Sequence, residues 1–210
     1  MPLTNDFFQP KNCDLAIWEI RESVEELHDG LSLSVAQTQE LTTRKTRIGQ
    51  QGFLAVRHAL QQLGIALEEL EITPEGAPHL PNNYCSLSHT PHYAVAATAS
   101  TPLGVDLEKE RQKIRHIAPK FAHPNERDAI DKAHEIAQLT RLWTAKEAVY
   151  KAIKQNGISF AHQIRISPFS LQAKRGEAQV FLSDKTLKLG LQFSTFNQHH
   201  LTIAHLIQEL

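Results

Sequence analysis

Two acidic side chains share one short segment in the middle of the chain, GVDLE at residues 104–108. If this segment is a strand, Asp106 and Glu108 point to one face and Val105 and Leu107 to the other. The two carboxylates would then lie roughly 6.5–7 Å apart along the strand. Both can therefore reach one hard cation, and oxygen ligands favour Mg2+ over Zn2+. The alternative is an amphipathic strand with a solvated acidic face, which is a common pattern.

A second group of charged side chains lies in the segment WTAKEAVYK at residues 143–151. On a helix of about 100° per residue, Lys146 falls near the centre of an arc of apolar residues: Leu139, Leu142, Trp143, Val149, Tyr150 and Ile153. A solvated lysine would not occupy that position, so we expect Lys146 to meet a buried anion, such as a phosphate in a cleft. Glu147 and Lys151 lie at the edge of the arc, in the order that favours a surface ion pair. That pair is the alternative for these two residues, and it does not explain Lys146.

Two further groups can bind phosphate. His89, in the polar turn SLSHT at residues 86–90, can donate to a phosphate while backbone amides of the turn line the same site. The alternative is a capped turn with a structural imidazole. Basic side chains also lie along the first long helical segment, as either a phosphate clamp or a solvated helix face: Arg44, Lys45, Arg47 and Arg57.

The candidate site residues must be positioned by helices and strands that follow one another along the chain. The apolar pattern predicts a helix over Val35–Leu63 that Gly64 ends, a helix from Pro124 to about Ala133, and a helix over Ile136–Lys154 that Gly157 closes. The turn at residues 100–104 is expected to join its two flanking strands in a hairpin. The predicted strands are Leu15–Ile20, Leu70–Ile72, Tyr84–Leu87, Tyr93–Ala99, Val105–Glu108, Ile164–Ile166, Ala178–Leu182, Leu187–Phe193 and Leu201–Ile207.

The order of these elements predicts an α+β fold in which the two halves of the chain repeat a similar order of elements. Each half of the chain has a long helix followed by strands, which end in HYAVAATA at residues 92–99 and in HHLTIAHL at residues 199–206. This repeated order predicts two similar α+β halves, and a cleft between them would be the expected ligand site.

Composition narrows the class of protein. The 210 residues include 22 basic and 23 acidic side chains, so the net charge of −1 provides no field that would attract nucleic acid or anionic lipid. Cys13 and Cys85 are the two cysteines, a number that suits a reducing cytoplasm, and both are expected to be buried and inert. With neither a leader pattern nor a run long enough to span a bilayer, the sequence predicts a cytoplasmic protein without membrane or nucleic-acid partners.

Five segments together resemble the phosphopantetheinyl transferase superfamily, in particular its surfactin-synthetase-activating branch. They are GAP at 76–78, SLSHT at 86–90, GVDLE at 104–108, FAHPNE at 121–126 and WTAKEAVYK at 143–151. The combination of the last three is far more specific than any one of them. Two positions depart from the family pattern. Ala77 replaces a frequent lysine, which weakens any adenine-side contact of that loop, and Thr90 conservatively replaces a serine.

The resemblance implies a monomer made of two similar α+β halves related by pseudo-twofold symmetry, each a small sheet with a long helix. We expect the halves to be residues 1–102 and 103–210 and to form one compact unit together. The first half would bind the 3′-phosphate of coenzyme A through His89 and the basic helix, where Arg47 and Arg57 are our choices. The second half would bind magnesium and the pyrophosphate.

Within the second half, the resemblance makes Asp106, Glu108 and Glu147 the ligands of Mg2+, with Mn2+ as the alternative ion. Lys146 and Lys151 would neutralise the pyrophosphate of coenzyme A. Glu126 resembles a further acidic residue that the family places beside the metal. Glu147 would also accept a proton, and Lys151 would assist the leaving group.

The implied reaction transfers 4′-phosphopantetheine from coenzyme A to a serine hydroxyl of an apo acyl or peptidyl carrier protein and releases 3′,5′-ADP. A hypothesis of another class is a non-catalytic module that keeps the cleft and binds carrier proteins or nucleotides. A third, an RNA-binding domain that uses the basic helix, is the poorest, because stacking aromatics are not interleaved with its arginines.

Overall fold

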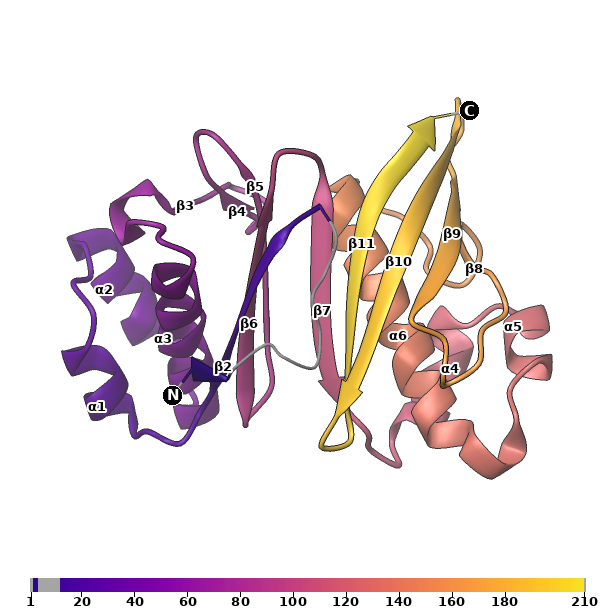
Figure 1. Ribbon diagram of the computed structural model, residues 1–210, viewed down its shortest axis with the longest axis horizontal. Coiled ribbons are helices and arrows are strands. Elements are labelled where there is room, and N and C mark those ends of the chain that lie inside the picture. The colour runs from indigo at the N-terminus through magenta and orange to yellow at the C-terminus, as the bar shows by residue number, and fades with distance from the viewer. Residues whose placement is uncertain (1, 4–11, 210) are drawn as a thin grey trace. The chain divides into compact units, whose positions relative to one another are not determined.

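The computed structural model describes residues 2–3 and 12–209, and the chain divides into two compact units, Met1–Ser100 and Thr101–Leu210. Each unit contains an antiparallel sheet and one long helix packed on it (Figure 1). The predicted α+β class is therefore confirmed. A pseudo-twofold relation between the halves, a boundary after residue 102 and a single compact unit stay predictions.

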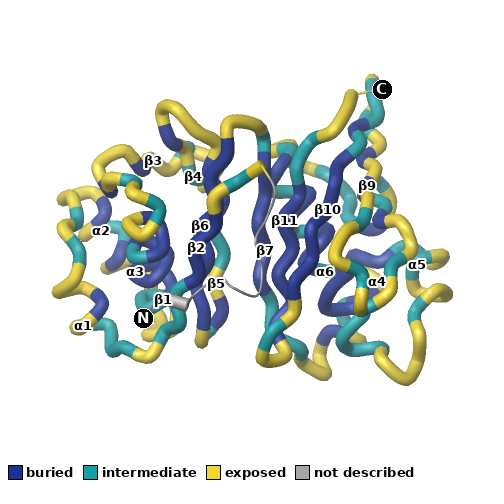
Figure 2. Tube along the Cα trace, viewed as in Figure 1, coloured by how far each residue is buried: buried dark blue, intermediate teal, exposed yellow. Residues whose placement is uncertain are grey.

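The first unit has a four-stranded sheet in the order β1-β2-β6-β5. Its members are β1 (Pro2–Leu3), β2 (Asp14–Glu19), β6 (Tyr93–Ala99) and β5 (Tyr84–His89), and β3 (Glu71–Ile72) pairs with β4 (Pro78–His79) in a separate ribbon. The helices are α1 (Val24–Asp29), α2 (Val35–Thr43) and α3 (Arg47–Gln62), of which α3 contacts β2, β5 and β6. Strand β6 is buried along its whole length and β2 is buried at Leu15, Ala16 and Ile17 (Figure 2), so the core of this unit includes both strands.

The prediction of one helix over residues 35–63 is wrong, because the chain leaves the helical conformation at residues 44–46. Arg44 is extended, with ψ of 106°, and the side chain of Thr46 accepts a hydrogen bond from the backbone N–H of Gly49 at the start of α3. A threonine that caps a helix in this way favours a new helical start over continuation. The short helix α1, whose N-cap is Ser23, was not predicted.

The second unit has a five-stranded antiparallel sheet in the order β7-β11-β10-β9-β8. Its strands are β7 (Leu103–Lys109), β11 (His199–Glu209), β10 (Thr186–Phe196), β9 (Arg175–Phe181) and β8 (Ile164–Ile166), and its helices are α4 (Ile114–Phe121), α5 (Pro124–Asp128) and α6 (Glu135–Ile153). Helix α6 crosses β7 and β11 on one face of the sheet (Figure 1). The predicted hairpin between β6 and β7 is wrong, because β6 pairs with β2 and β5 whereas β7 pairs with β11.

Two helices of this unit differ from the prediction. The helix that begins at Pro124 ends at Asp128 rather than near residue 133, and a single 3-10 turn capped by Asp131 then leads into α6. Helix α4 was missed because it contains Pro119, and an interior proline ordinarily indicates a helix end. Among the residues that the structure describes, none of the helices has the length and apolar character of a membrane span.

The two cysteines are free thiols. Cys85 is buried as predicted, whereas Cys13 is only partly buried. Burial, reinforced by the charge of Asp14, raises the pKa of the Cys13 thiol to about 11. The reactive thiolate is therefore disfavoured at neutral pH.

Helix α6 touches the backbone of β7 at Gly104. A Cβ atom at this position would overlap the carbonyl oxygen of Ala148 and lie 2.6 Å from the backbone nitrogen of Ala152. Because strand residues two apart share a face, Asp106 and Glu108 lie on the same side of β7 as Gly104, toward α6. The absence of a side chain at Gly104 is thus what lets the helix approach the two carboxylates.

Replacing Gly104 by alanine should force α6 away from β7, because the obstructing atoms are backbone atoms. We expect Gly104→Ala to cost at least about 2 kcal/mol, which lowers the melting temperature by roughly 4–8 °C for a chain of this size. Thermal unfolding by circular dichroism measures the effect. The matched control is Gly49→Ala in α3, where an added Cβ lies 3.1 Å from the Thr46 hydroxyl, and its melting temperature should fall less because only a side-chain atom has to shift by a few tenths of an ångström. Equal melting temperatures for Gly104→Ala and the unmodified protein would contradict the close contact.

Candidate functional site

Strand β7 and helix α6 bring four of the predicted site residues together, and we call Asp106, Glu108, Glu147 and Lys151 the acidic cluster. The ammonium group of Lys151 donates to Oδ1 of Asp106 at 2.8 Å and to the carbonyl oxygen of Val105 at 3.1 Å. Asp106 is only 5% exposed, so this ion pair is shielded from solvent on the carboxylate side. Lys151 is thus tied to β7, rather than serving only as a surface partner of Glu147.

Trp143 orients the second carboxylate of the cluster. Its indole Nε1 donates to Oε1 of Glu108 at 3.3 Å, and its ring packs against the rings of Phe121 and Phe160. One residue along α6, the hydroxyls of Thr144 and Thr202 are hydrogen-bonded at 2.9 Å, which fastens the helix to β11. The acidic cluster therefore rests on a helix held at several points.

The carboxylates of the cluster are electrostatically coupled. Burial raises the pKa of Glu147 to about 7, the charges of Asp106 and Glu108 add to the rise, and Lys151 opposes it. Burial and Asp106 also raise the pKa of Glu108, while the hydrogen bond from Trp143 opposes that rise. The structure thus brings together the three residues predicted as metal ligands. Their role in binding a metal stays a prediction.

Over residues 2–3 and 12–209, the structure contains no group of three or more His, Cys, Asp or Glu side chains already arranged to hold a metal ion. The donor set nevertheless fits a hard cation, because it consists of carboxylate oxygens that repel one another in a poorly hydrated place. A divalent ion would offset both the burial and the mutual repulsion that raise the pKa of Glu147 and Glu108.

Lys146 is fully buried, as its place on the helical wheel predicted. Its ammonium group donates to Oε2 of Glu126 at 2.7 Å and to the carbonyl oxygens of Phe160 and Ile164 at 2.8 and 2.7 Å. An ammonium group has three N–H donors, so this set accounts for all of them. Burial lowers the pKa of Lys146 to about 8 despite the opposing effect of Glu126. The buried anion that the sequence required is therefore supplied by Glu126.

Glu126 links three elements of the second unit. Its Oε2 also accepts from the backbone N–H of His123 at 2.8 Å, and its Oε1 accepts from the backbone N–H of Ile166 at 2.9 Å. The groups that shift the pKa of Glu147 are those of the acidic cluster, and Glu126 is not among them. The observed contacts give Glu126 and Lys146 a structural role that joins α5, α6 and β8. Their predicted catalytic and pyrophosphate-binding roles stay predictions.

In the first unit, Arg57 is enclosed and Arg47 is accessible. The guanidinium group of Arg57 is 2% exposed, donates to the carbonyl oxygen of Phe53 at 2.8 Å and pairs with Glu40 at 3.7 Å. Burial lowers its pKa to about 10. Arg47 is exposed and lies 3.6 Å from Glu25. Of the two predicted 3′-phosphate ligands on α3, Arg47 is therefore the one open to a ligand.

His89 ends β5 as an exposed side chain and packs on α3 at Gly52. A Cβ atom at Gly52 would overlap the imidazole ring of His89, so the contact depends on glycine at this helical position. The sequence analysis missed Gly52, Gly104 and the hydrogen bond of Trp143. The available signals were a glycine inside a helix, which costs about 1 kcal/mol relative to alanine unless packing requires it, and an indole beside apolar positions, whose N–H needs an acceptor when it is withdrawn from water.

Comparison with known protein families gives a match to the second unit. The model of the 4′-phosphopantetheinyl transferase superfamily matches residues 102–204, a range that includes β7, α6 and all of the acidic cluster. The match therefore covers the elements that assemble the site described above.

Several transferases align with a larger part of the chain. The 4′-phosphopantetheinyl transferase ffp of Bacillus subtilis is 31% identical over 107 residues, 50% of this chain and 46% of that protein. Another 4′-phosphopantetheinyl transferase of Bacillus subtilis is 29% identical over 134 residues, 62% of this chain and 58% of that protein. The transferase psf-1 of Bacillus pumilus is 25% identical over 179 residues, 78% of this chain and 73% of that protein. The first two alignments span about half of the relatives' length. The family match and these relatives agree with the motifs on β7 and α6, and the chain belongs to the 4′-phosphopantetheinyl transferase superfamily.

Proposed function

We propose that this protein transfers 4′-phosphopantetheine from coenzyme A to a serine of an apo acyl or peptidyl carrier protein. The observation that carries the proposal is the acidic cluster itself: three coupled carboxylates and a lysine that meet inside the segment matched by the family model. The relatives named as 4′-phosphopantetheinyl transferases support the same reaction.

Asp106, Glu108 and Glu147 would hold Mg2+, or Mn2+ in its place. A bound divalent ion supplies charge neutralisation at the pyrophosphate of coenzyme A. Lys151 now pairs with Asp106 at 2.8 Å and is partly exposed, so its ammonium group can turn to a phosphate once another cation occupies the carboxylates. Lys146 has the weaker claim to the pyrophosphate, because its three donors are already used inside the unit.

Glu147 is the proposed proton acceptor in the reaction. The serine oxygen attacks the β-phosphorus, the bond from that phosphorus to the bridging oxygen breaks, and 3′,5′-ADP leaves with the electron pair. Glu147 would accept the serine proton as a general base. Lys151 would screen the negative charge on the leaving group.

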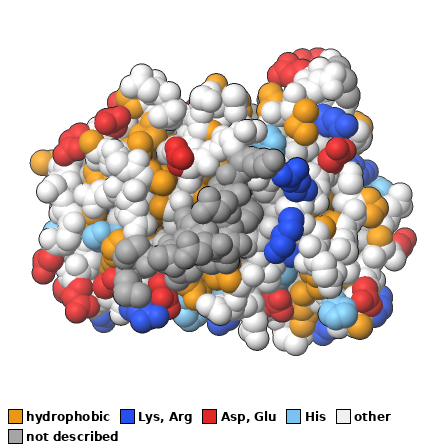
Figure 3. Space-filling view, viewed as in Figure 1, with side chains coloured by type: hydrophobic (Ala, Val, Ile, Leu, Met, Phe, Trp, Pro, Cys, Tyr) orange, Lys and Arg blue, Asp and Glu red, His pale blue; other side chains and the backbone are white. Residues whose placement is uncertain are grey.

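The first unit would bind the 3′-phosphate of coenzyme A through the accessible Arg47 and His89. Arg57 would contribute only after its guanidinium group leaves the contacts with Glu40 and Phe53. We further propose a cytoplasmic monomer whose partners are coenzyme A and the carrier protein. Acidic and basic side chains of the described residues are interspersed on the face drawn in Figure 3, which suits a small anionic ligand better than a polyanion.

The competing hypothesis is a binding module without catalysis. It predicts that the protein binds coenzyme A but transfers no phosphopantetheine. The unmodified protein and its Glu147→Gln variant would then be equally inactive. The acidic cluster favours the enzyme, because a module that only binds carrier proteins or nucleotides has no need of three coupled carboxyl groups beside a lysine.

A transfer assay tests the proposed reaction. With coenzyme A, Mg2+ and an apo carrier protein, mass spectrometry should detect the addition of one phosphopantetheine to the carrier serine. Glu147→Gln should lower kcat by about 100-fold or more, the usual contribution of a general base. Glu177→Gln, an exposed glutamate on β9, is the matched control and should react like the unmodified protein. Absence of transfer to a panel of acyl and peptidyl carriers would refute the proposal.

The two lysines of α6 should separate function from stability. Lys151→Met should raise the KM for coenzyme A and lower kcat, with a smaller fall in melting temperature than Lys146→Met, because Lys151 is partly exposed whereas Lys146 is fully buried. Lys146→Met leaves Glu126 as an unpaired buried charge, which costs about 3–5 kcal/mol, so the melting temperature should fall by at least about 6 °C. The double variant Glu126→Gln/Lys146→Met should recover part of that loss. A Lys146→Met protein of normal stability with a raised KM for coenzyme A would instead support the predicted pyrophosphate contact.

Stability without added metal should depend on Glu147. Its pKa of about 7 in the folded protein exceeds its ordinary value of 4.5, so the folded state binds the proton more tightly. The free energy of unfolding contributed by this group therefore falls as pH rises from about 4.5 to about 7. Glu147→Gln should remove this slope and raise the melting temperature at about pH 8 by at least about 2 °C. Scanning calorimetry at about pH 4.5 and about pH 8 measures the melting temperatures that check this expectation. At about pH 8, added Mg2+ should stabilise the unmodified protein more than the variant. A slope unchanged by the substitution would contradict the burial of an ionised Glu147.

A further inference from the structure

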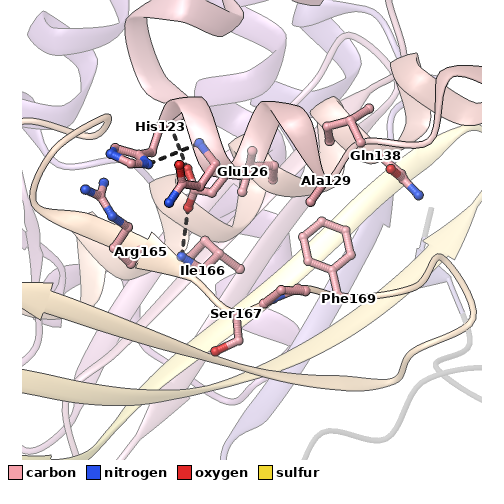
Figure 4. Close-up of a pocket in the computed structure, with 12 residues that line it drawn as sticks. His123, Glu126, Ala129, Gln138, Arg165, Ile166, Ser167 and Phe169 are labelled. Atoms are coloured by element: carbon pink, nitrogen blue, oxygen red, sulfur yellow. Dashed lines mark hydrogen bonds between the residues drawn. The ribbon is translucent and has the colours of Figure 1, made fainter.

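A cavity lies within the Thr101–Leu210 unit, apart from the acidic cluster. It has a volume of about 190 Å³, opens to solvent, and lies between α5, α6 and the chain that follows β8. Apolar side chains form much of its wall: Ala129, Ile130, Leu142, Ile166, Pro168 and Phe169. Figure 4 shows His123, Glu126 and Arg165 at one side of the cavity and Phe169 and Gln138 at the other. The cavity is therefore apolar in much of its body, and its charged side chains gather at one end.

Arg165 supplies a cation at the polar end. One of its guanidinium nitrogens, Nη1, donates to the carbonyl oxygen of Ala161. Within the described part of the chain, the structure gives its other N–H groups no acceptor. A planar guanidinium group with spare donors suits a carboxylate, which can accept two parallel hydrogen bonds.

His123 adds a neutral donor beside Arg165. Its Nδ1 accepts from the backbone N–H of Asn125 at 3.2 Å, so the proton of the neutral ring lies on Nε2. Desolvation and the nearby charge of Arg165 lower the pKa of His123, while Glu126 opposes that change. Near neutral pH the ring therefore offers one N–H donor.

The carboxylate of Glu126 also lines the cavity, but its charge is compensated. It accepts from Lys146 and from the backbone N–H groups of His123 and Ile166. The uncompensated charge at this end of the cavity is consequently that of Arg165.

We propose that this cavity binds a small monocarboxylate with a short apolar body, whose carboxylate lies against Arg165 and His123. A volume of about 190 Å³ is enough for a short aliphatic chain, so we take straight-chain acids of about four to six carbons as the probes. An uncharged ligand of the same length leaves the guanidinium group without an anion.

This site is distinct from the proposed catalytic one. Gln138, Leu142 and Lys146 follow one another at intervals of four on α6, and the first two line the cavity. Trp143, Glu147 and Lys151 form the neighbouring row, about 100° around the helix, and serve the acidic cluster. Binding at the cavity can therefore be tested without coenzyme A, metal or a carrier protein.

Isothermal titration calorimetry of the full chain with butyrate, hexanoate and octanoate tests the proposal. Hexanoate should bind at millimolar or lower concentration, and octanoate should gain little over it because its additional carbons would extend into solvent. Hexanamide should bind at least about 10-fold more weakly. Arg165→Gln should weaken hexanoate binding by a similar factor, whereas the control Arg175→Gln, an exposed arginine on β9, should leave it unchanged.

A second variant fixes the location. Ala129→Phe should fill the cavity from its rim and abolish hexanoate binding, with a melting temperature within a few degrees of the unmodified protein because residue 129 is exposed. Three outcomes would overturn the proposal: no binding of any acid, equal binding of hexanoate and hexanamide, or unchanged hexanoate binding in folded Ala129→Phe. None of these outcomes depends on transferase activity.

Discussion

Backbone contact between α6 and β7 is the constraint on which the second unit depends. At Gly104 a single Cβ atom would overlap Ala148 and come within 2.6 Å of the Ala152 nitrogen, so the helix sits directly on the strand. The carboxylates at positions 106 and 108 are short, and they reach the side chains of α6 because the helix is this close. A helix one methyl group farther away would leave Lys151 and Trp143 without their partners on β7. The close packing of α6 on β7 is therefore what brings the residues of the acidic cluster together.

The two lysines of α6 show how the same helix uses one charge for structure and one for chemistry. Lys146 has an acceptor for each donor, including Glu126, so it is a closed ion pair that joins three elements. Lys151 shares its environment with three carboxyl groups, so one positive charge faces up to three negative charges. A closed pair holds the structure together, whereas an unbalanced cluster favours an added cation.

The sequence was informative wherever a pattern had a fixed period. Alternation placed Asp106 and Glu108 on one face, and the helical wheel predicted that Lys146 is buried. Neither pattern specifies a distant partner. The helical wheel could not indicate that the anion beside Lys146 belongs to Glu126, twenty residues earlier, or that Asp106 is the partner of Lys151. Local rules also failed where capping or pairing decided the outcome. Thr46 restarts a helix that the apolar pattern continued, and β7 pairs with the distant β11 rather than with its neighbour in the chain.

Helix α6 also separates the two sites of this unit. The row of Gln138 and Leu142 faces the cavity, the row of Trp143 and Glu147 faces the acidic cluster, and Lys146 lies in the first row as the anchor to Glu126. A ligand in the cavity would touch Ile166 and Glu126, both of which take part in that anchor. Any influence of the cavity on the acidic cluster must then pass through a displacement of α6, and the contact at Gly104 resists such a displacement. The same packing that assembles the charges therefore favours two sites that act independently.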